Sequence, residues 1–352
     1  MEKKIPLVSV IIPVYNGEAH ILECVKCLQA QTLRAFEAIF IDDGSQDSSR
    51  AILESVTHKD KRIRFVTKEH QNAGAARNRG IKEATGTYLI FLDVDDRFEP
   101  ELLKSASDRL ERTQADIVVY HFKELYGDGT RSFRRGYSAK AKGCSANGKE
   151  DETGILDVSA RPEEAMLFGG ASIWNKMYRA DLIRKGNLHF DEIRIYNDVT
   201  FVVRANLKAQ RIACLDQYLY TYYCNVPNSI SARRGESFLV LKEALRSLEE
   251  QTGEVDPELV SMAKAHFMIK IFLLDVGDYG TKDAEEYFQY CQNYLKTTHF
   301  SAKRMMAFYP QLCILIWLMR LIKYRQIRFL DQLGIMKYIR KRIHGRKIQK
   351  KK

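Results

Sequence analysis

The sequence predicts an α/β fold, in which a mainly parallel sheet has helices on both faces and is followed by a helical C-terminal region. Two observations support this. The first 122 residues alternate short apolar runs with helical patterns at the spacing of βα units. From residue 236 onward, apolar residues recur at helical spacing. The 352 residues, 45% hydrophobic and with only seven prolines, exclude a disordered or collagen-like chain and leave room for two folded units.

Each element of the first 122 residues follows from its apolar pattern. The segment 8–14 (VSVIIPV) is a continuous apolar run, as expected for a strand that is buried on both faces. Sites in such sheets lie at the carboxyl ends of strands, so the loops after the first, second and fourth strands form the candidate site. The predicted strands are 8–14, 36–41, 63–67, 87–92 and 116–122, and the predicted helices are 19–31, 48–57, 73–83 and 100–112.

The pattern changes after residue 122. Residues 123 to about 157 are rich in Gly, Ser, Lys and Asp, which predicts a mobile excursion or a long functional loop. Order is expected again from Pro162. The elements expected there are a helix, the segment 172–178, a short helix, a helix from 194–198 to Ala209, strands at 211–215 and 218–224, and helices at 236–252, 257–275 and 283–296.

The net charge of +11 is concentrated at the C-terminus. Residues 301–352 contain 15 lysines and arginines and one acidic residue, a net charge of +14, whereas the first 300 residues have a net charge of −3. A protein that is basic over its whole surface is excluded. The segments 305–319 and 322–343 mix large apolar residues with bases at helical spacing, which is typical of an in-plane helix at an anionic membrane surface.

Two other interpretations of this basic segment are nucleic-acid binding through phosphate contacts and a helix that packs on its own protein. The interleaved large apolar residues exceed what phosphate contacts require, so we expect a membrane surface and no nucleic acid. The longest apolar run, 312–319, is far shorter than the roughly 20 residues of a membrane span. The N-terminus lacks the apolar region of a signal peptide, so we expect a cytosolic location.

The seven scattered cysteines do not form the framework of a secreted disulfide-rich domain. Cys24 and Cys27 form a lone CxxC within a predicted helix, without the second pair or nearby histidine of a zinc site.

Three carboxylates follow the fourth predicted strand. Asp93, Asp95 and Asp96 lie within four residues and repel one another, so a bound cation would explain their proximity. Mg²⁺ and Mn²⁺ prefer oxygen ligands and share their shell with the phosphates of a substrate. The alternative is a solvated acidic turn that caps the next helix. The position at a strand end favours the metal site.

The loops after the first two strands carry groups suited to a planar base. Asp42 and Asp43 leave the second strand side by side, and one of them would point into the crevice, where a base or ribose is hydrogen-bonded. Gly44 fits a turn that needs positive φ. Tyr15 and Asn16 offer an aromatic face and an amide after the first strand.

A run of small and polar residues opens the helix at 73–83. A helix N-terminus with Arg77 nearby suits a pyrophosphate. Equally, Gly74 and Gly80 allow close packing of the helix. The chain contains neither GxGxxG nor GxxxxGK[ST], so dinucleotide-binding and P-loop proteins lose their main support.

Together, the segments 8–16 (VSVIIPVYN), 42–45 (DDGS), 72–78 (NAGAARN) and 92–96 (LDVDD) closely resemble family 2 glycosyltransferases with the Rossmann-like GT-A fold. The resemblance covers residues 5 to about 122 and, more loosely, 172–231. It implies an inverting, metal-dependent transfer of a sugar from a nucleoside diphosphate donor.

By this resemblance, Pro13, Tyr15 and Asp43 line the base pocket, and Asp43 bonds the uracil edge. Asp93 lies by the ribose or the donor sugar. Asp95 is the metal-binding carboxylate of the DxD motif, a task that Asp96 can share, and the cofactor is Mn²⁺ or Mg²⁺.

Inversion requires one in-line displacement, in which a single carboxylate deprotonates the attacking hydroxyl. The family places this base in a Glu-Asp pair after a Trp-Asn-Lys segment on the acceptor side. Here the segment is Trp174, Asn175 and Lys176, and the pair is Asn197 and Asp198, so Asp198 is the expected base. The alternative role of Asn197 or Asp198 is a helix N-cap.

The sequence thus divides into a nucleotide-sugar-binding half (1–122), an acceptor-side half (123–235), a helical extension (236–300) and a basic amphipathic tail (301–352). We expect an inverting glycosyltransferase that moves a sugar from a UDP-sugar to a hydroxyl of a growing, lipid-linked cell-surface glycan of the bacterial surface-polysaccharide type. We expect it at the inner face of the membrane. The alternative is a catalytically idle nucleotide-sugar-binding or assembly subunit with the same fold.

Overall fold

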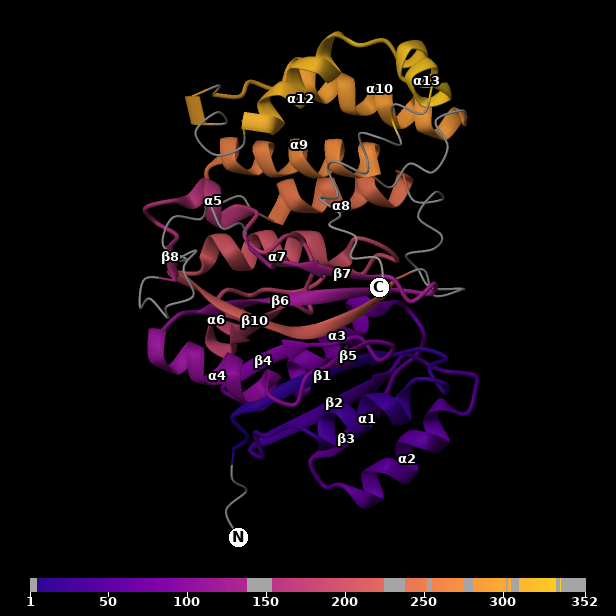
Figure 1. Cartoon of the computed structure of the whole chain (residues 1–352), viewed down its shortest axis with the longest axis vertical. Coiled ribbons are helices and arrows are strands. Elements are labelled where there is room, and N and C mark those ends of the chain that lie inside the picture. Colours follow the sequence, from indigo (N-terminus) through magenta and orange to yellow (C-terminus); the bar gives the residue numbers. More distant parts are fainter. Residues whose placement is uncertain are drawn as a thin grey trace. The chain divides into compact units, whose positions relative to one another are not determined.

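The computed structural model describes residues 5–137, 154–224, 238–251, 255–274, 281–301, 303–304, 310–333 and 336 (Figure 1). The chain forms two compact units, residues 1–224 and 225–352. Of the sequence-based expectations, residues 138–153 of the loop at 123–157 and residues 302, 305–309, 334–335 and 337–352 of the basic tail lie outside the described residues.

The first unit is built on one ten-stranded mixed sheet in the order β3-β2-β1-β4-β9-β6-β10-β5, with β7 on β6 and β8 on β10. The pairs among β1, β2, β3 and β4 are parallel, as is β6 with β10, and the other pairs are antiparallel. The strands are β1 (Val8–Val14), β2 (Phe36–Asp42), β3 (Ile63–Thr67), β4 (Tyr88–Phe91), β5 (Arg97–Phe98), β6 (Ile117–Tyr126), β7 (Arg131–Arg134), β8 (Ile155–Asp157), β9 (Lys176–Arg179) and β10 (Arg211–Cys224).

Helices cover both faces of this sheet, so the predicted fold class is confirmed. The connections from β1 to β2 and from β2 to β3 run in one direction and the return from β3 to β4 runs in the other, which puts α1 and α2 on one face and α3 on the opposite face. The helices are α1 (Ile21–Gln29), α2 (Ser49–Lys59), α3 (Ala73–Glu83), α4 (Leu102–Thr113), α5 (Pro162–Met166), α6 (Ala180–Lys185) and α7 (Asn197–Lys208).

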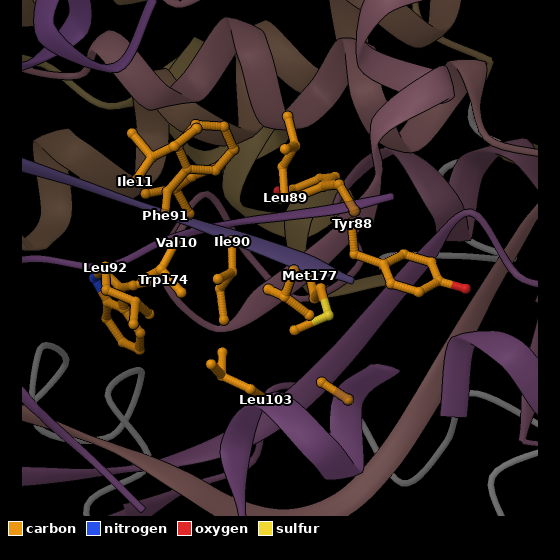
Figure 2. Packing of buried hydrophobic residues seen from close by; sticks show 14 of the residues in the cluster. Val10, Ile11, Tyr88, Leu89, Ile90, Phe91, Leu92, Leu103, Trp174 and Met177 are labelled. Atoms are coloured by element: carbon orange, nitrogen blue, oxygen red, sulfur yellow. The ribbon is translucent and has the colours of Figure 1, made fainter. Parts of the chain in front are cut away.

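The core of the unit lies on both sides of β1 and β4. The register pairs Val10 with Ile90 and Ile11 with Phe91, so alternate residues face opposite sides of the sheet. Figure 2 shows Ile11 and Phe91 on one side, and Val10 and Ile90 on the side of Leu103 from α4. Continuous apolar runs are therefore required in both strands, as the sequence has them.

The structure differs from the sequence-based expectation at three strands. β6 continues to Tyr126 and forms a hairpin with β7, although residues from 123 onward were expected to form a loop. The segment 172–178 contains β9, which pairs with both β4 and β6. The two strands expected at 211–224 are one strand, β10, whose pairing with β6 shifts register between Leu215 and Tyr220.

The described part of the second unit is helical. Its described elements are α8 (Phe238–Gln251), α9 (Pro257–Leu274), α10 (Lys282–Thr297), α12 (Pro310–Leu321) and α13 (Tyr324–Gln332). Phe272, Phe288, Leu295 and Ile316 are among its buried side chains. No described helix has the length and apolar character that crossing a bilayer requires.

Candidate active site

The loops after β1 and β2 are held together by hydrogen bonds at the carboxyl edge of the sheet. Asn16 accepts a bond from the Gln46 amide at 2.8 Å, and its own amide donates to Ser45 Oγ at 3.0 Å. Asn16 has a positive φ of 49°, an uncommon conformation for a residue other than glycine. The turn therefore fixes the direction of the neighbouring Tyr15.

Tyr15 is connected through the side chain of His70 to Asp43, the residue predicted to recognise the base. The Tyr15 ring stacks on His70, with 3.9 Å between the ring centroids. His70 Nδ1 lies 2.9 Å from Asp43 Oδ2. Asp43 is almost fully buried, and it also pairs with Lys68 Nζ at 2.5 Å and accepts a bond from the Gln71 amide.

The aromatic face and the carboxylate that the resemblance assigns to a base therefore lie together, and Pro13 is half-buried in β1 just before them. His70 and Lys68 were missed by the sequence reasoning. They lie in a polar stretch that looks like a solvated turn, and only the parallel pairing of β2 with β3 brings it to Asp43.

The three carboxylates after β4 differ in their surroundings. Asp96 is buried, with Oδ2 accepting a bond from the Tyr220 hydroxyl at 2.7 Å and Oδ1 from the Tyr223 amide at 2.9 Å. Asp93 accepts a bond from Arg77 at 2.8 Å. Among the described residues, no side chain donates to the Asp95 carboxylate and no lysine or arginine pairs with it. Asp95 is thus the carboxylate of this turn whose oxygens are open to a ligand.

Burial, together with charge repulsion at this turn, raises two pKa values. The pKa of Asp95 is raised by burial and by the charge of Asp93. The pKa of Asp96 is raised well above its ordinary value by burial and by the charges of Asp95 and Asp93. A divalent cation would relieve this repulsion, so the residues fit one.

The protein's own ligands for such a cation are few. Within the described residues no group of three or more His, Cys, Asp and Glu side chains is arranged to hold a metal. This composition fits a Mn²⁺ or Mg²⁺ ion that completes its shell with phosphate oxygens. Cys24 and Cys27 are free thiols in α1, and burial raises the pKa of Cys24.

Arg77 connects the turn after β4 to the start of α7. Its Nη2 donates to Asp93 Oδ1 and its Nη1 to Asn197 Oδ1, each at 2.8 Å, and the guanidinium lies 5.5 Å from the centre of the Phe190 ring. Arg77 is buried, and both of these contacts are to protein groups. The structure therefore places Arg77 between the carboxylate turn and the start of α7.

The start of α3 is packed against the segment that leads into α7. A Cβ atom on Gly74 would lie 2.1 Å from the carbonyl oxygen of Asp191. Asn78 exchanges two hydrogen bonds with the backbone of Phe190, at 2.8 and 3.0 Å. Gly80 packs on Ile11, where a Cβ would lie 2.3 Å from Cγ2. The close-packing interpretation of both glycines is confirmed.

Asp198 lies in the first turn of α7. Tyr196, two residues before Asp198, has a positive φ of 63°. This conformation is rare for an aromatic residue and occurs preferentially at functional sites. The pKa of Asp198 is raised by burial, while the positive charges of Arg77 and Lys176 lower it and Asp93 raises it. The charges of Arg77, Asp93 and Lys176 thus act on the Asp198 carboxylate.

The Trp-Asn-Lys segment, residues 174–176, is buried and holds a loop in place. Lys176 is fully buried, and its ammonium donates to the carbonyl oxygens of Gly169, Gly170 and Ser172 at 2.7 to 3.0 Å. Asn175 is also fully buried and donates to Gly169 O. Both residues therefore position the loop at 169–175.

Trp174 belongs to the same cluster. Its ring stacks on Tyr220 at 4.8 Å and on Tyr222 at 5.4 Å between centroids. Tyr220 in turn holds Asp96, so the Trp174 stack links the segment to the carboxylate turn. Tyr220 and Tyr223 were not among the predicted site residues, although the tyrosine-rich run of β10 was a visible signal.

Comparison with known proteins agrees with this architecture. Residues 9–168 match the profile of glycosyl transferase family 2. The uncharacterized glycosyltransferase EpsJ of Bacillus subtilis strain 168 is 36% identical over 228 residues, which are 64% of this chain and 63% of EpsJ, less than two thirds of its length. A protein of the same strain named as glycosyltransferase EpsH is 27% identical over 355 residues, 92% of this chain and 93% of EpsH.

Two solved structures share the fold over nearly the whole chain. Residues 1–349 of S. aureus TarS in complex with UDP-GlcNAc align with a TM-score of 0.64 at 20% identity, covering 93% of this chain and 92% of that one. The mannosyltransferase PcManGT of Pyrobaculum calidifontis, in complex with GDP-Man and Mn²⁺, aligns with a TM-score of 0.54 at 15% identity, covering 96% and 87%.

The sheet, with carboxylates at its carboxyl edge, and these structural neighbours define a GT-A glycosyltransferase fold. Residues 9–168 match glycosyl transferase family 2, so this part of the chain is assigned to that family.

Proposed function

We propose that this protein is an inverting, metal-dependent glycosyltransferase that moves a sugar from a UDP-sugar to a hydroxyl of a growing cell-surface glycan. The observation that supports this best is the Arg77 bridge between Asp93, at the donor edge of the sheet, and Asn197, next to Asp198. The bridge brings a carboxylate with a raised pKa to the edge where a nucleotide sugar would lie. The UDP-GlcNAc complex of TarS, which aligns with a higher TM-score than the GDP-Man complex of PcManGT, supports a uridine donor.

The chain's own residues have distinct roles in this reaction. Asp198 accepts the proton of the attacking hydroxyl, and its raised pKa suits that task near neutral pH. Tyr15 and Asp43 bind the base, and Asp93 holds the ribose or the donor sugar. Asp95 would hold Mn²⁺ or Mg²⁺, whose charge would stabilise the leaving diphosphate.

The carboxylate of Asp96 has a supporting role in this proposal. Both of its oxygens already accept hydrogen bonds from β10, so Asp96 fixes the turn that presents Asp95. Asn197 stands where the family's usual pair has a glutamate, and its neutral amide accepts the Arg77 bond without adding a charge beside Asp198.

We also propose that the C-terminal region attaches the enzyme to an anionic membrane surface at the inner face of the cell membrane, where a lipid-linked acceptor would lie. The support is the exposed apolar face of α12 together with the net charge of +14 of residues 301–352.

The proposed function is tested by the substitution Asp198→Asn. We expect the variant to lose transfer, and the slow hydrolysis of the donor, by at least about 100-fold, the lower range for a general base. Binding of UDP with Mn²⁺ should be unchanged, because the base is not part of the donor pocket. The measurement is release of free sugar from a panel of nucleotide sugars.

Two outcomes contradict the proposal. Full activity of Asp198→Asn would show that another group is the base. Absence of sugar release by the wild-type protein from every nucleotide sugar, with Mn²⁺ or Mg²⁺ present and UDP bound, would instead indicate the catalytically idle binding subunit.

A further inference from the structure

Strands β5, β6, β7 and β10 present two rows of residues, with cationic and aromatic side chains among them, on one face of the sheet. The register places Arg97 opposite Thr221, Thr221 opposite Lys123, and Lys123 opposite Phe133. The next row places Tyr223 opposite Leu125 and Leu125 opposite Arg131. Side chains directly opposite each other in neighbouring strands point to the same face, so both rows line one surface.

A pocket of about 340 Å³ lies on this surface. The volume is within the range of roughly 300 to 1,000 Å³ for small-molecule sites. Its walls include Arg97, Lys123, Arg131, Phe133, Thr221 and Tyr223. The Trp174 cluster is not part of this wall, because Trp174 stacks on Tyr220 and Tyr222, which alternate with Thr221 and Tyr223 along β10.

The pocket has an excess of positive charge. Within the described residues, Arg97 and Arg131 pair with no carboxylate, and Lys123 pairs with Glu99 at 2.7 Å. Glu124 is the acidic residue of the wall, and its carboxylate is already bound by Arg134 and the Tyr126 hydroxyl. An anion that enters the pocket therefore meets at least two cations without a carboxylate partner.

Aromatic rings complete the wall. The Phe133 side chain is 49% exposed, so a ring face is available to a ligand. Arg97 lies 5.7 Å from the centre of the Tyr223 ring, which holds the guanidinium at the pocket wall. Aromatic faces with flanking cations suit a ring-shaped ligand that has an apolar face and a negative charge, rather than a small inorganic anion.

The pocket is joined directly to the carboxylate turn. Arg97 Nη1 donates to the carbonyl oxygen of Asp96 at 2.8 Å, and the Tyr223 amide donates to Asp96 Oδ1 at 2.9 Å. A ligand held by Arg97 and Tyr223 is therefore close to the proposed donor site without using any of the residues assigned to the donor.

We infer that this pocket binds an acidic sugar unit, one that bears a carboxylate or a phosphate, of the acceptor glycan. The inference rests on the proposed transferase function. It names the chemical class of the acceptor, a negatively charged saccharide. The carboxylates at the strand ends do not specify this class.

The test uses ligand-observed NMR on the full-length protein with UDP and Mn²⁺ present at saturation, so that the donor site is filled. Glucuronic acid and glucose 6-phosphate are the acidic probes, and glucose is the neutral control. We expect binding of one or both acidic probes and at least tenfold weaker binding of glucose. The two acidic probes distinguish a carboxylate from a phosphate.

The matched variants are Arg131→Gln and Arg50→Gln. Arg131 is exposed at the pocket, so its substitution leaves the fold intact, and we expect at least tenfold weaker binding of the acidic probe. Arg50 is an exposed residue of α2 and pairs with Glu54. Helix α2 connects β2 to β3, which lie several strands away from β6 and β7 in the sheet, so this substitution should not change the binding of the probe. Lys123→Gln should weaken the probe as Arg131→Gln does.

The inference is wrong if neither acidic probe binds, if glucose binds equally well, if Arg131→Gln binds the acidic probe as wild type does, or if raising the UDP concentration displaces the probe. Binding of UDP itself is measured in the same samples. Retained UDP binding and sugar release with no acidic-sugar binding overturn only this inference, whereas absent UDP binding overturns the proposed function.

Discussion

The guanidinium of Arg77 contacts Asp93, in the turn after β4, and Asn197, at the start of α7, and its charge also acts on a third residue, Asp198. Its positive charge lowers the pKa of Asp198, which burial raises. Asp198 acts as a base only when it is deprotonated. Removing the cation therefore raises the pKa of Asp198 further and moves the acid limb of the rate profile to higher pH.

The prediction compares Arg77→Gln with Arg77→Lys. Both variants lose the two-pronged contact to Asp93 and Asn197, so both should lose at least about tenfold in kcat. Only Arg77→Gln loses the charge, so only its acid limb in kcat/KM should move to higher pH. If the two variants and wild type share one limb, Arg77 acts through position alone.

Asp95 and Asp96 are neighbours with separable roles. The substitution Asp95→Ala should weaken Mn²⁺-dependent UDP binding by more than about tenfold, because the proposed protein ligand of the metal is lost. Asp96→Asn should retain that binding and lower the melting temperature, because an amide nitrogen would face the Tyr220 hydroxyl or the Tyr223 amide. Titration with Mn²⁺ in the presence of UDP measures the first effect and calorimetry the second. The reverse pattern would exchange the two roles.

At the scale of elements, α3 is the platform on which the α7 segment rests. Gly74→Ala places a methyl group 2.1 Å from the Asp191 carbonyl oxygen, a backbone atom that cannot rotate away. The segment before α7 must move, and Asp198 moves with it. We expect kcat to fall by at least about tenfold, since misplacement by about 1 Å costs up to 100-fold.

Gly80→Ala is the matched control on the same helix. Its methyl group would meet Ile11, a core side chain of β1, so we expect a loss of about 1 to 3 kcal/mol in the free energy of unfolding with kcat within about twofold of wild type. If Gly74→Ala and Gly80→Ala lower kcat equally, the effect of Gly74 comes from general destabilisation.

The elements that the sequence predicted well are those whose signal is local. β1, β3 and α3 have the expected bounds, because short segments rich in apolar residues specify the two strands and the cap at Asn72 specifies the start of the helix. β9 was not predicted as a strand because it begins with a lysine. The burial of Lys176 depends on three carbonyl groups of a loop whose glycines, Gly169 and Gly170, have positive φ.

The site shows the same division between local and non-local signals. Asp43, Asp93 and Asp95 were predicted because they lie in the loops just after β2 and β4. The bond from Arg77 to Asn197 joins residues 120 positions apart, and no pattern in the sequence records that pairing. The contact of His70 with Tyr15 likewise depends on how the loops of two strands meet.

At the scale of the whole molecule, the charge is divided between a slightly acidic first 300 residues and a strongly basic end. Part of that end packs on its own unit. Ile316 and Met319 of α12 are buried, and Arg320 donates to the Leu295 and Thr298 carbonyls at the end of α10. The self-packed interpretation of the tail therefore holds for one face of α12.

The opposite face of α12 is apolar and exposed. Ile314, Trp317, Leu318 and Leu321 follow the spacing i, i+3, i+4 and i+7, and their exposed fractions run from 44% to 63%. In α13, Phe329 is 59% exposed. Exposed cations follow on the same segment: Lys323, Arg325 and Arg328. An apolar stripe with adjacent cations is the pattern of a helix that lies in an anionic membrane surface.

The prediction for this surface is a triple substitution, Ile314→Ser, Trp317→Ser and Leu321→Ser. All three side chains are mostly exposed, so the fold should be retained, whereas deleting residues 301–352 would also uncover the partners of Ile316 and Met319. Each large apolar side chain contributes about 1.5 to 3 kcal/mol when it is fully buried, so the affinity for vesicles that contain anionic lipid should fall by more than tenfold.

Gln289→Ser with Asn293→Ser, at exposed neutral positions of α10, is the control and should bind as wild type does. Binding to anionic vesicles should also weaken as salt is raised, because the cations act at the surface. Equal binding of the triple variant and wild type in a vesicle co-sedimentation assay would move the membrane contact away from α12.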